Sequence, residues 1–286
     1  ISGNHDSAER LSFASRILRG TGLFLCGDLY HTLAPVILKD DDGEVAFAPL
    51  PYAEPGKVRE ALSTDVHTHE EAERALSDFL LRQMGHAARK IAIAHEFVAG
   101  CSASDSDLIS ADIFAPYNYT ALGHLHGPQQ AGGKENVRYS GSLLKYSFSE
   151  AAQKKGVIVG EIDGAGQVGT KFTSLAPRHE VRAIKGFFDD LIKGESEDFL
   201  MAELLDEGPV IDAMARLRQK YPRMMTIQSR RRMNSGSGER SFDLMKKVDP
   251  LGMFRVFYKE FQDKEFTEEE ENYIKELWED LRKEDD

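Results

Sequence analysis

Two short hydrophobic runs in this chain end on a histidine. Residues 90–95, Lys-Ile-Ala-Ile-Ala-His, have the apolar pattern of a buried β-strand. Residues 119–124, Tyr-Thr-Ala-Leu-Gly-His, repeat the design. Two strands that each present a histidine at their C-terminal end predict a shared site.

The pattern predicts further elements on both sides of these strands. A helix is expected over residues 6–20, because Asp6 and Glu9 have capping-box spacing and Gly20 can end it. A longer helix fits residues 68–86. Strands are expected at residues 23–26, 35–38, 45–48, 137–140, 156–162 and 169–175.

Pro177 marks a candidate domain boundary. Residues 179–229 have the pattern of a compact β-α-β-α-β unit, and residues 230–238 have linker composition. Two amphipathic helices follow, the second opening at Thr267. We therefore predict a domain over 1–177, a small α/β domain over 178–232, and a linker with C-terminal helices over 233–286.

Composition narrows the class of protein. No apolar run approaches the roughly 18 residues that a membrane span needs, and two cysteines in 286 residues favour a reducing, cytoplasmic setting. The net charge of −12 argues against a nucleic-acid partner at first sight. However, residues 264–286 hold eleven acidic and four basic side chains, so the rest of the chain is only mildly acidic.

Three motifs carry the chemistry of the chain. They are Gly-Asn-His-Asp at residues 3–6, Ala-His-Glu-Phe at 94–97 and Gly-His-Leu-His at 123–126. Each alone is weak, but their occurrence in this order is specific. Imidazole nitrogens with amide or carboxylate oxygens suit a first-row divalent ion, and two such ions can activate water against a phosphoryl group.

In this order the motifs resemble the later motifs of calcineurin-like metallophosphoesterases, especially the SbcD and Mre-type nucleases. The resemblance implies an α/β four-layer sandwich of two β-sheets flanked by helices, then a small α/β capping domain and partner-binding helices. It also implies two divalent metal ions, foremost Mn, with Fe, Zn or Mg as alternatives.

The resemblance assigns roles to the motif residues. Asn4, His95 and His124 would hold one metal and His126 the other. His5 would protonate the leaving oxygen, with Asp6 beside it as an orienting carboxylate. The alternatives are structural: a strand-end histidine is often only hydrogen-bonded, and Gly-Asn favours a turn in any protein.

The same family suggests surfaces for DNA and for a partner. Tyr139 and Ser140 lie in a stretch that is near DNA in such nucleases, although a strand and tight turn would use the same residues. A basic cluster of the capping domain, or equally a solvated helix face, contains Arg216, Arg218, Arg230 and Arg231. Aromatic side chains at helical spacing favour an ATPase partner over an internal core: Phe254, Phe257, Tyr258 and Phe261.

The family resemblance therefore implies a metal-dependent DNA nuclease subunit, a double-strand exonuclease and single-strand or hairpin endonuclease working with an SbcC-type coiled-coil ATPase. Such subunits form a homodimer within a heterotetramer. Relatives also carry Asp-x-His and Gly-Asp motifs ahead of Gly-Asn-His-Asp, which the printed sequence lacks, so we expect this chain alone to be inactive. The alternatives are a stand-alone phosphatase or phosphodiesterase, and a non-catalytic interaction module.

Overall fold

The computed structural model describes residues 1–100, 108–206 and 208–229, with positions 252, 254, 255, 258, 267, 270, 271, 273 and 274. Contacts divide the chain into two compact units. Unit 1 comprises Ile1–Ala183 and Glu197–Leu200, and unit 2 comprises Ile184–Ser196 and the described residues from Met201 onward. The domain boundaries predicted after residues 177 and 232 stay predictions.

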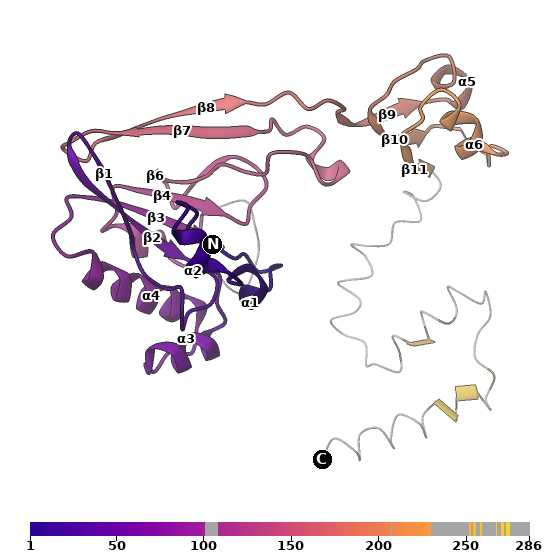
Figure 1. The fold of residues 1–286 in the computed structure, drawn as a ribbon. Helices are drawn as coiled ribbons and strands as arrows, with labels where there is room; N and C mark the ends of the chain where they lie inside the picture. Colours follow the sequence, from indigo (N-terminus) through magenta and orange to yellow (C-terminus); the bar gives the residue numbers. More distant parts are fainter. Residues whose placement is uncertain are drawn as a thin grey trace. The chain divides into compact units, whose positions relative to one another are not determined.

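A six-stranded sheet forms the centre of unit 1 (Figure 1), with the strand order β1-β2-β3-β4-β6-β5. The strands β2, β3, β4 and β6 are mutually parallel, whereas β1 and β5 run antiparallel to their neighbours. The bounds are β1 (Val36–Asp40), β2 (Gly43–Leu50), β3 (Arg89–His95), β4 (Tyr119–Gly123), β5 (Gln129–Ala131) and β6 (Lys134–Tyr139). In this register His95 pairs with Gly123, so β3 and β4 end side by side.

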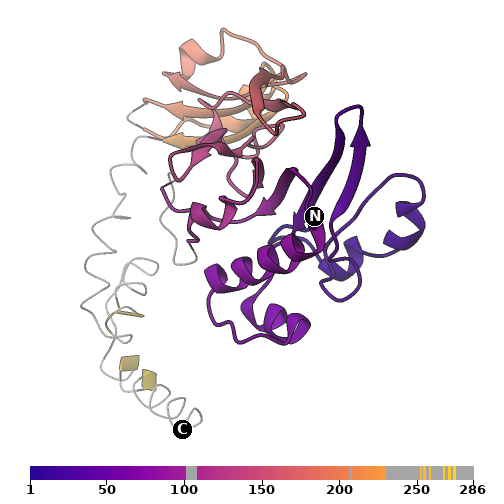
Figure 2. The same cartoon turned by 90° about the vertical axis from the view of Figure 1, so that its left-hand side faces the viewer.

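The helices α3 (Pro55–Leu62) and α4 (His69–Met84) lie on the same side of this sheet in both Figure 1 and Figure 2. The apolar face of α4 packs over β2, where the small residues Ala46 and Ala48 are completely buried. The predicted long helix is confirmed. Thr68 caps α4 in a capping box with Glu71, as its sequence pattern indicates.

The predicted helix over residues 6–20 is wrong in two respects. It is two short helices, α1 (Ala8–Leu11) and α2 (Ser15–Arg19), because Ala14 adopts a left-handed φ of 60°. The N-cap is Ser7, which accepts the Arg10 N–H, and not Asp6. The strand expected at residues 23–26 is also absent, since that segment is held by single backbone bonds such as Ser2 N–H to the Cys26 carbonyl.

The strands predicted after β6 are confirmed. The hairpin of β7 (Gly156–Ile162) and β8 (Val168–Ser174) forms a separate two-stranded sheet. Two 3-10 turns, η1 (Ala111–Phe114) and η2 (Phe148–Glu150), complete the elements of unit 1. The described residues are thus mixed α/β, as predicted, whereas the four-layer sandwich stays a prediction.

The segment after residue 180 follows the predicted β-α-β-α-β order. It comprises β9 (Val181–Gly186), α5 (Phe188–Leu191), β10 (Phe199–Leu204), α6 (Ala213–Arg218) and β11 (Met224–Ser229). The three strands form one sheet with β10 in the centre. The apolar side chains Phe188 on α5, Leu217 on α6 and Met224 on β11 are buried. The apolar positions that recur along this segment therefore form its interior.

The few described positions near the C-terminus are mainly helical. The Thr267 hydroxyl accepts the Glu270 N–H, and the Glu270 carboxylate accepts the Thr267 N–H, which is the expected N-terminal cap. Tyr258 donates to Glu270 at 3.1 Å, so the two predicted helices also contact each other. Phe257 and Phe261 lie outside the described residues.

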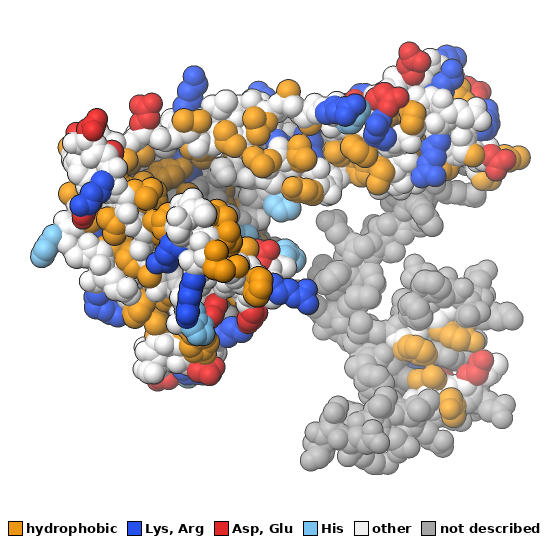
Figure 3. Space-filling model, in the orientation of Figure 1, with side chains coloured by type: hydrophobic (Ala, Val, Ile, Leu, Met, Phe, Trp, Pro, Cys, Tyr) orange, Lys and Arg blue, Asp and Glu red, His pale blue; other side chains and the backbone are white. Residues whose placement is uncertain are grey.

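Unit 1 keeps several large apolar side chains at its surface. Phe13 and Ile17, on and beside the N-terminal helices, are 82% and 76% exposed. Figure 3 shows apolar side chains gathered over this part of the molecule. None of the helices that the structure describes is both long enough and apolar enough to cross a membrane.

Candidate metal centre

Three polar side chains from distant segments meet at the carboxyl ends of β3 and β4. The Nε2 atom of His95 lies 3.1 Å from Oδ1 of Asn4 and 3.2 Å from Nδ1 of His124. The predicted first-metal ligands are therefore together in space. Asn4 comes from the N-terminal loop, His95 ends β3, and His124 follows β4.

Two glycines make room for the His95 ring. A Cβ atom at Gly3 would lie 2.6 Å from the ring carbon Cε1, and one at Gly123 would lie 2.8 Å from Nδ1. Both distances are shorter than real Cβ contacts allow. Gly3 opens the Gly-Asn-His-Asp motif and Gly123 opens the Gly-His-Leu-His motif. Both therefore lie against the same imidazole ring, that of His95.

His124 is held in an unusual backbone conformation. Its φ of 104° lies in a backbone region that residues other than glycine rarely adopt. Phe97 packs edge-on against its ring with a centroid distance of 3.8 Å. Sequence reasoning missed Phe97, although its position two residues after His95 was visible in the second motif.

The electrostatic setting keeps His95 neutral. Burial, followed by the neighbouring His124 ring, lowers the pKa of His95 to about 4. An uncharged imidazole has the lone pair that a metal ion needs. At neutral pH, His95 is therefore in its ligand form.

The donor set fits one divalent ion with N and O ligands. Ligand atoms about 2.0–2.2 Å from a common ion are roughly 3.3 Å apart, close to the separations found here. The described residues contain no group of three or more His, Cys, Asp or Glu placed to hold an ion. The candidate set is instead two histidines and an asparagine amide, which is a weaker set without carboxylate.

Asn4 also borders an open pocket of about 390 Å³. Acidic side chains dominate its charged lining, with Asp6, Glu9, Asp28, Glu54 and Glu60 against Lys57. A negative pocket of this kind raises the local concentration of cations. It gives no basic surface for phosphate.

The two predicted catalytic residues lie on the loop that carries Asn4. His5 is exposed to solvent. The Asp6 carboxylate accepts the Gly3 N–H at 2.8 Å, and the Asp6 N–H donates to the Gly3 carbonyl. Asp6 thus closes the turn that presents Asn4, while the role of His5 stays a prediction.

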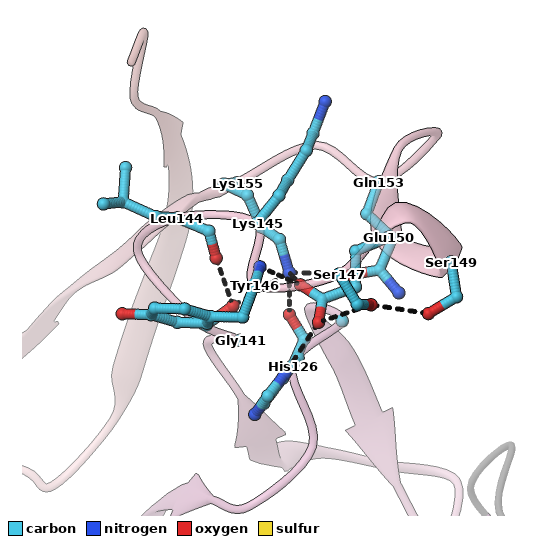
Figure 4. Close-up of polar contacts among 12 residues, drawn as sticks. His126, Gly141, Leu144, Lys145, Tyr146, Ser147, Ser149, Glu150, Gln153 and Lys155 are labelled. Atoms are coloured by element: carbon cyan, nitrogen blue, oxygen red, sulfur yellow. Dashed lines mark hydrogen bonds and ion pairs between the residues drawn. The ribbon is translucent and has the colours of Figure 1, made fainter. Parts of the chain in front are cut away.

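His126, the predicted second-metal ligand, is hydrogen-bonded to a carboxylate that the motifs did not indicate (Figure 4). Its Nδ1 lies 2.9 Å from Oε1 of Glu150. Burial alone would raise the pKa of Glu150, but hydrogen bonds from Lys155 and His126 lower it to about 2. Glu150 and Lys155 are only 6% and 5% exposed. No pattern in the sequence indicated that these two charged residues would be buried.

Tyr139 is completely buried, so this structure offers DNA no access to it. Its hydroxyl donates to the Glu96 carbonyl at 2.7 Å and accepts the Val98 N–H at 2.9 Å. Tyr139 therefore fixes the backbone that follows His95. Ser140, in contrast, is partly exposed at the end of β6, and its contact with DNA stays a prediction.

The predicted basic cluster is partly engaged in structural contacts. The Arg216 guanidinium lies 4.2 Å from the centroid of the Phe188 ring, a cation–π contact. Arg218 donates from Nε to the Met224 carbonyl at 3.2 Å. Arg230 and Arg231 lie outside the described residues.

The fold and the cluster define a mixed α/β protein with a histidine and asparagine site at the carboxyl ends of parallel strands. Residues 177–261 match the family model SbcD_C, described as the type 5 capsule protein repressor C-terminal domain. This match supports an SbcD-type protein and, with it, a nuclease or hydrolase family. It covers less than a third of the chain and none of the histidine cluster.

Proposed function

We propose that this protein is a metal-dependent phosphodiesterase, the nuclease subunit of an SbcD-type DNA-processing complex. The observation that carries the proposal is the convergence of Asn4, His95 and His124. Asn4 lies 91 positions before His95 and His124 lies 29 positions after it, yet each places a donor atom within 3.2 Å of His95 Nε2.

In the proposed mechanism Asn4, His95 and His124 would hold one divalent ion and His126 would be a ligand of a second, both of them Mn²⁺. Bound ions of this kind polarise a phosphoryl oxygen and lower the pKa of water. His5 donates a proton to the leaving oxygen, which its exposed position at the loop permits. Asp6 would keep the loop that carries Asn4 and His5 folded, by accepting the Gly3 N–H.

The DNA substrate and the ATPase partner are proposed from the family match. The match covers the β-α-β-α-β segment and extends to residue 261, across the first predicted C-terminal helix. Exposed aromatic surface at Phe254, which is 41% exposed, supports partner binding. We propose double-strand exonuclease activity and endonuclease activity on single strands or hairpins, with cytoplasmic location and a dimer within a heterotetramer.

A second candidate is an interaction module without catalysis. One observation favours it: the family match lies outside the histidine cluster, so it supports the C-terminal part more strongly than the site. The two candidates differ in metal binding. A stand-alone phosphatase would bind metal as well but would not need the partner.

The deciding experiment compares Mn²⁺ binding by calorimetry in the wild-type protein, His95→Ala and His86→Ala. His86 is an exposed histidine at the end of α4 and serves as the matched control. We expect His95→Ala to abolish binding and His86→Ala to leave it unchanged. Equal Mn²⁺ binding in all three proteins would contradict the assigned site, and no binding at all would favour the interaction module.

Substrate class needs a second measurement. Cleavage of a blunt DNA duplex and of bis-p-nitrophenyl phosphate is compared with Mn²⁺, with and without an SbcC-type ATPase. The nuclease hypothesis predicts DNA cleavage that the ATPase increases. Hydrolysis of the small diester alone, indifferent to the ATPase, would indicate a stand-alone phosphodiesterase.

A further inference from the structure

A buried ion pair lies behind His126 and contacts it at two points. Glu150, at the end of η2, accepts a hydrogen bond from the His126 ring through Oε1 and pairs through Oε2 with Lys155 at 2.7 Å. The His126 side chain is 52% exposed, whereas the two charged residues are almost fully buried. The ring therefore has one fixed side and one side open to solvent.

Lys155 completes the arrangement by binding the backbone of the same histidine. Its Nζ lies 2.8 Å from the His126 carbonyl oxygen, 2.9 Å from Oγ of Ser142 and 2.8 Å from Oε1 of Gln153. Figure 4 shows these contacts converging on the ammonium group. An ammonium group has three donors, all of which find oxygen partners here.

The turn after β6 holds the His126 backbone from another direction. The Ser142 N–H donates to the His126 carbonyl at 3.1 Å. Gly141 has a φ of 78°, and a Cβ atom there would lie 2.6 Å from the same carbonyl oxygen. Glycine at position 141 is therefore needed for the close backbone approach to His126.

We propose that Glu150 is the positioning residue of His126: it fixes the proton on Nδ1 and directs the Nε2 lone pair outward, toward a divalent cation. The inference rests on the proposed metal-dependent function. A carboxylate paired with a buried lysine accepts hydrogen bonds but cannot donate one. The proton must then reside on Nδ1, which leaves Nε2 as the ligand atom.

The substitution Glu150→Gln tests this with little change in shape. The amide oxygen is expected to face Lys155, because the Lys155 ammonium group and the Tyr146 N–H both donate to that position and an amide NH₂ there would set donors against donors. The amide NH₂ then faces His126 and donates to Nδ1, so the ring proton moves to Nε2. The variant should therefore invert the tautomer and block the proposed ligand atom.

Asp40→Asn is the matched control. Asp40 holds Arg89, a cation that is 1% exposed, through two hydrogen bonds of 2.5 and 2.8 Å in the same unit. Both substitutions thus deprive a buried cation of its carboxylate partner, and both should destabilise the fold. Only Glu150→Gln touches a histidine, so a general loss of stability is separated from a loss of positioning.

The first readout is the tautomer of His126 by long-range ¹H–¹⁵N NMR of the metal-free protein. We expect the Nδ1–H form in the wild type, Asp40→Asn and the conservative Glu150→Asp, and the Nε2–H form in Glu150→Gln. A wild-type His126 in the Nε2–H form, or in an even mixture, would overturn the proposal. This result does not depend on whether the protein binds metal.

The second readout is Mn²⁺ affinity by calorimetry. Loss of a carboxylate that orients a ligand histidine weakens metal binding by about 10–100-fold. We expect this decrease in Mn²⁺ affinity in Glu150→Gln and a smaller decrease in Glu150→Asp. A Glu150→Gln protein that binds Mn²⁺ as tightly as the wild type would overturn the proposal. Absence of Mn²⁺ binding in the wild type would instead contradict the proposed function. The tautomer measurement would still decide whether Glu150 positions His126.

Discussion

Glu73 is a carboxylic acid in the hydrophobic core, on the face of α4 that also carries the buried Leu76 and Leu80. It is 1% exposed, and neither of its oxygens has a hydrogen-bond partner among the described residues. A buried polar group without a partner costs about 1–3 kcal/mol. We therefore predict that Glu73→Leu stabilises the protein by about 1–3 kcal/mol, whereas most core substitutions destabilise.

The effect depends on pH. Burial, and then the charge of Glu96, raises the pKa of Glu73 well above the ordinary value of a glutamate side chain. Below pH 4.5 the carboxyl is protonated in both the folded and the unfolded chain, so ionisation costs nothing. As the pH rises, the unfolded chain releases the proton first, and stability falls until the pH passes the folded pKa. Each pH unit in this window costs about 1.4 kcal/mol.

The assay is urea unfolding followed by circular dichroism at pH 4, 5.5, 7 and 8. Glu73→Gln removes the charge but keeps two buried polar atoms, so it should match the wild type at pH 4 and exceed it at pH 7. Glu73→Leu should exceed it at every pH. Asp78→Asn, on the exposed face of the same helix, is the control and should change little.

Two outcomes would refute this reasoning. A Glu73→Leu protein less stable than the wild type would mean that the carboxyl group has a partner that stabilises the fold. A stability difference between wild type and Glu73→Gln that stays constant with pH would mean that Glu73 titrates near its ordinary pKa.

Two further predictions concern the surroundings of His95. Gly123→Ala should weaken Mn²⁺ binding at least about tenfold by calorimetry, because its Cβ would lie 2.8 Å from the His95 ring, whereas Gly169→Ala on β8, with open space around it, should not. Tyr139→Phe should lower the free energy of unfolding by about 1–3 kcal/mol in urea, since it leaves the buried Val98 N–H without its acceptor. An unchanged affinity or an unchanged stability, respectively, would contradict them.

Local signals in the sequence were sufficient for most elements. The helix predicted from residue 68 begins after the N-cap Thr68, and the strand predicted over residues 156–162 has the observed bounds of β7. The two runs ending on histidine became adjacent parallel strands, which brought His95 and His124 together. Patterns of this kind act within a few residues, so one sequence is enough to predict them.

Features that depend on distant partners could not be predicted. The left-handed Ala14 interrupts a regular helical pattern without any glycine or proline to indicate it. Glu150 contacts His126 from 24 residues away, and its burial depends on Lys155. Tyr139 was predicted to lie near DNA, whereas it is buried together with Val137, two residues earlier on β6.

The glycines of the motifs are visible as local sequence patterns, but the reason for them lies in contacts with residues that are distant along the chain. Gly3 and Gly123 are required because the His95 ring occupies the space of their side chains, and Gly141 is required because the His126 carbonyl does the same. A motif such as Gly-Asn-His-Asp therefore combines a proposed metal ligand with the space that a proposed ligand from another motif needs. The three motifs therefore indicate the site more strongly together than separately, because residues of one motif pack against residues of another.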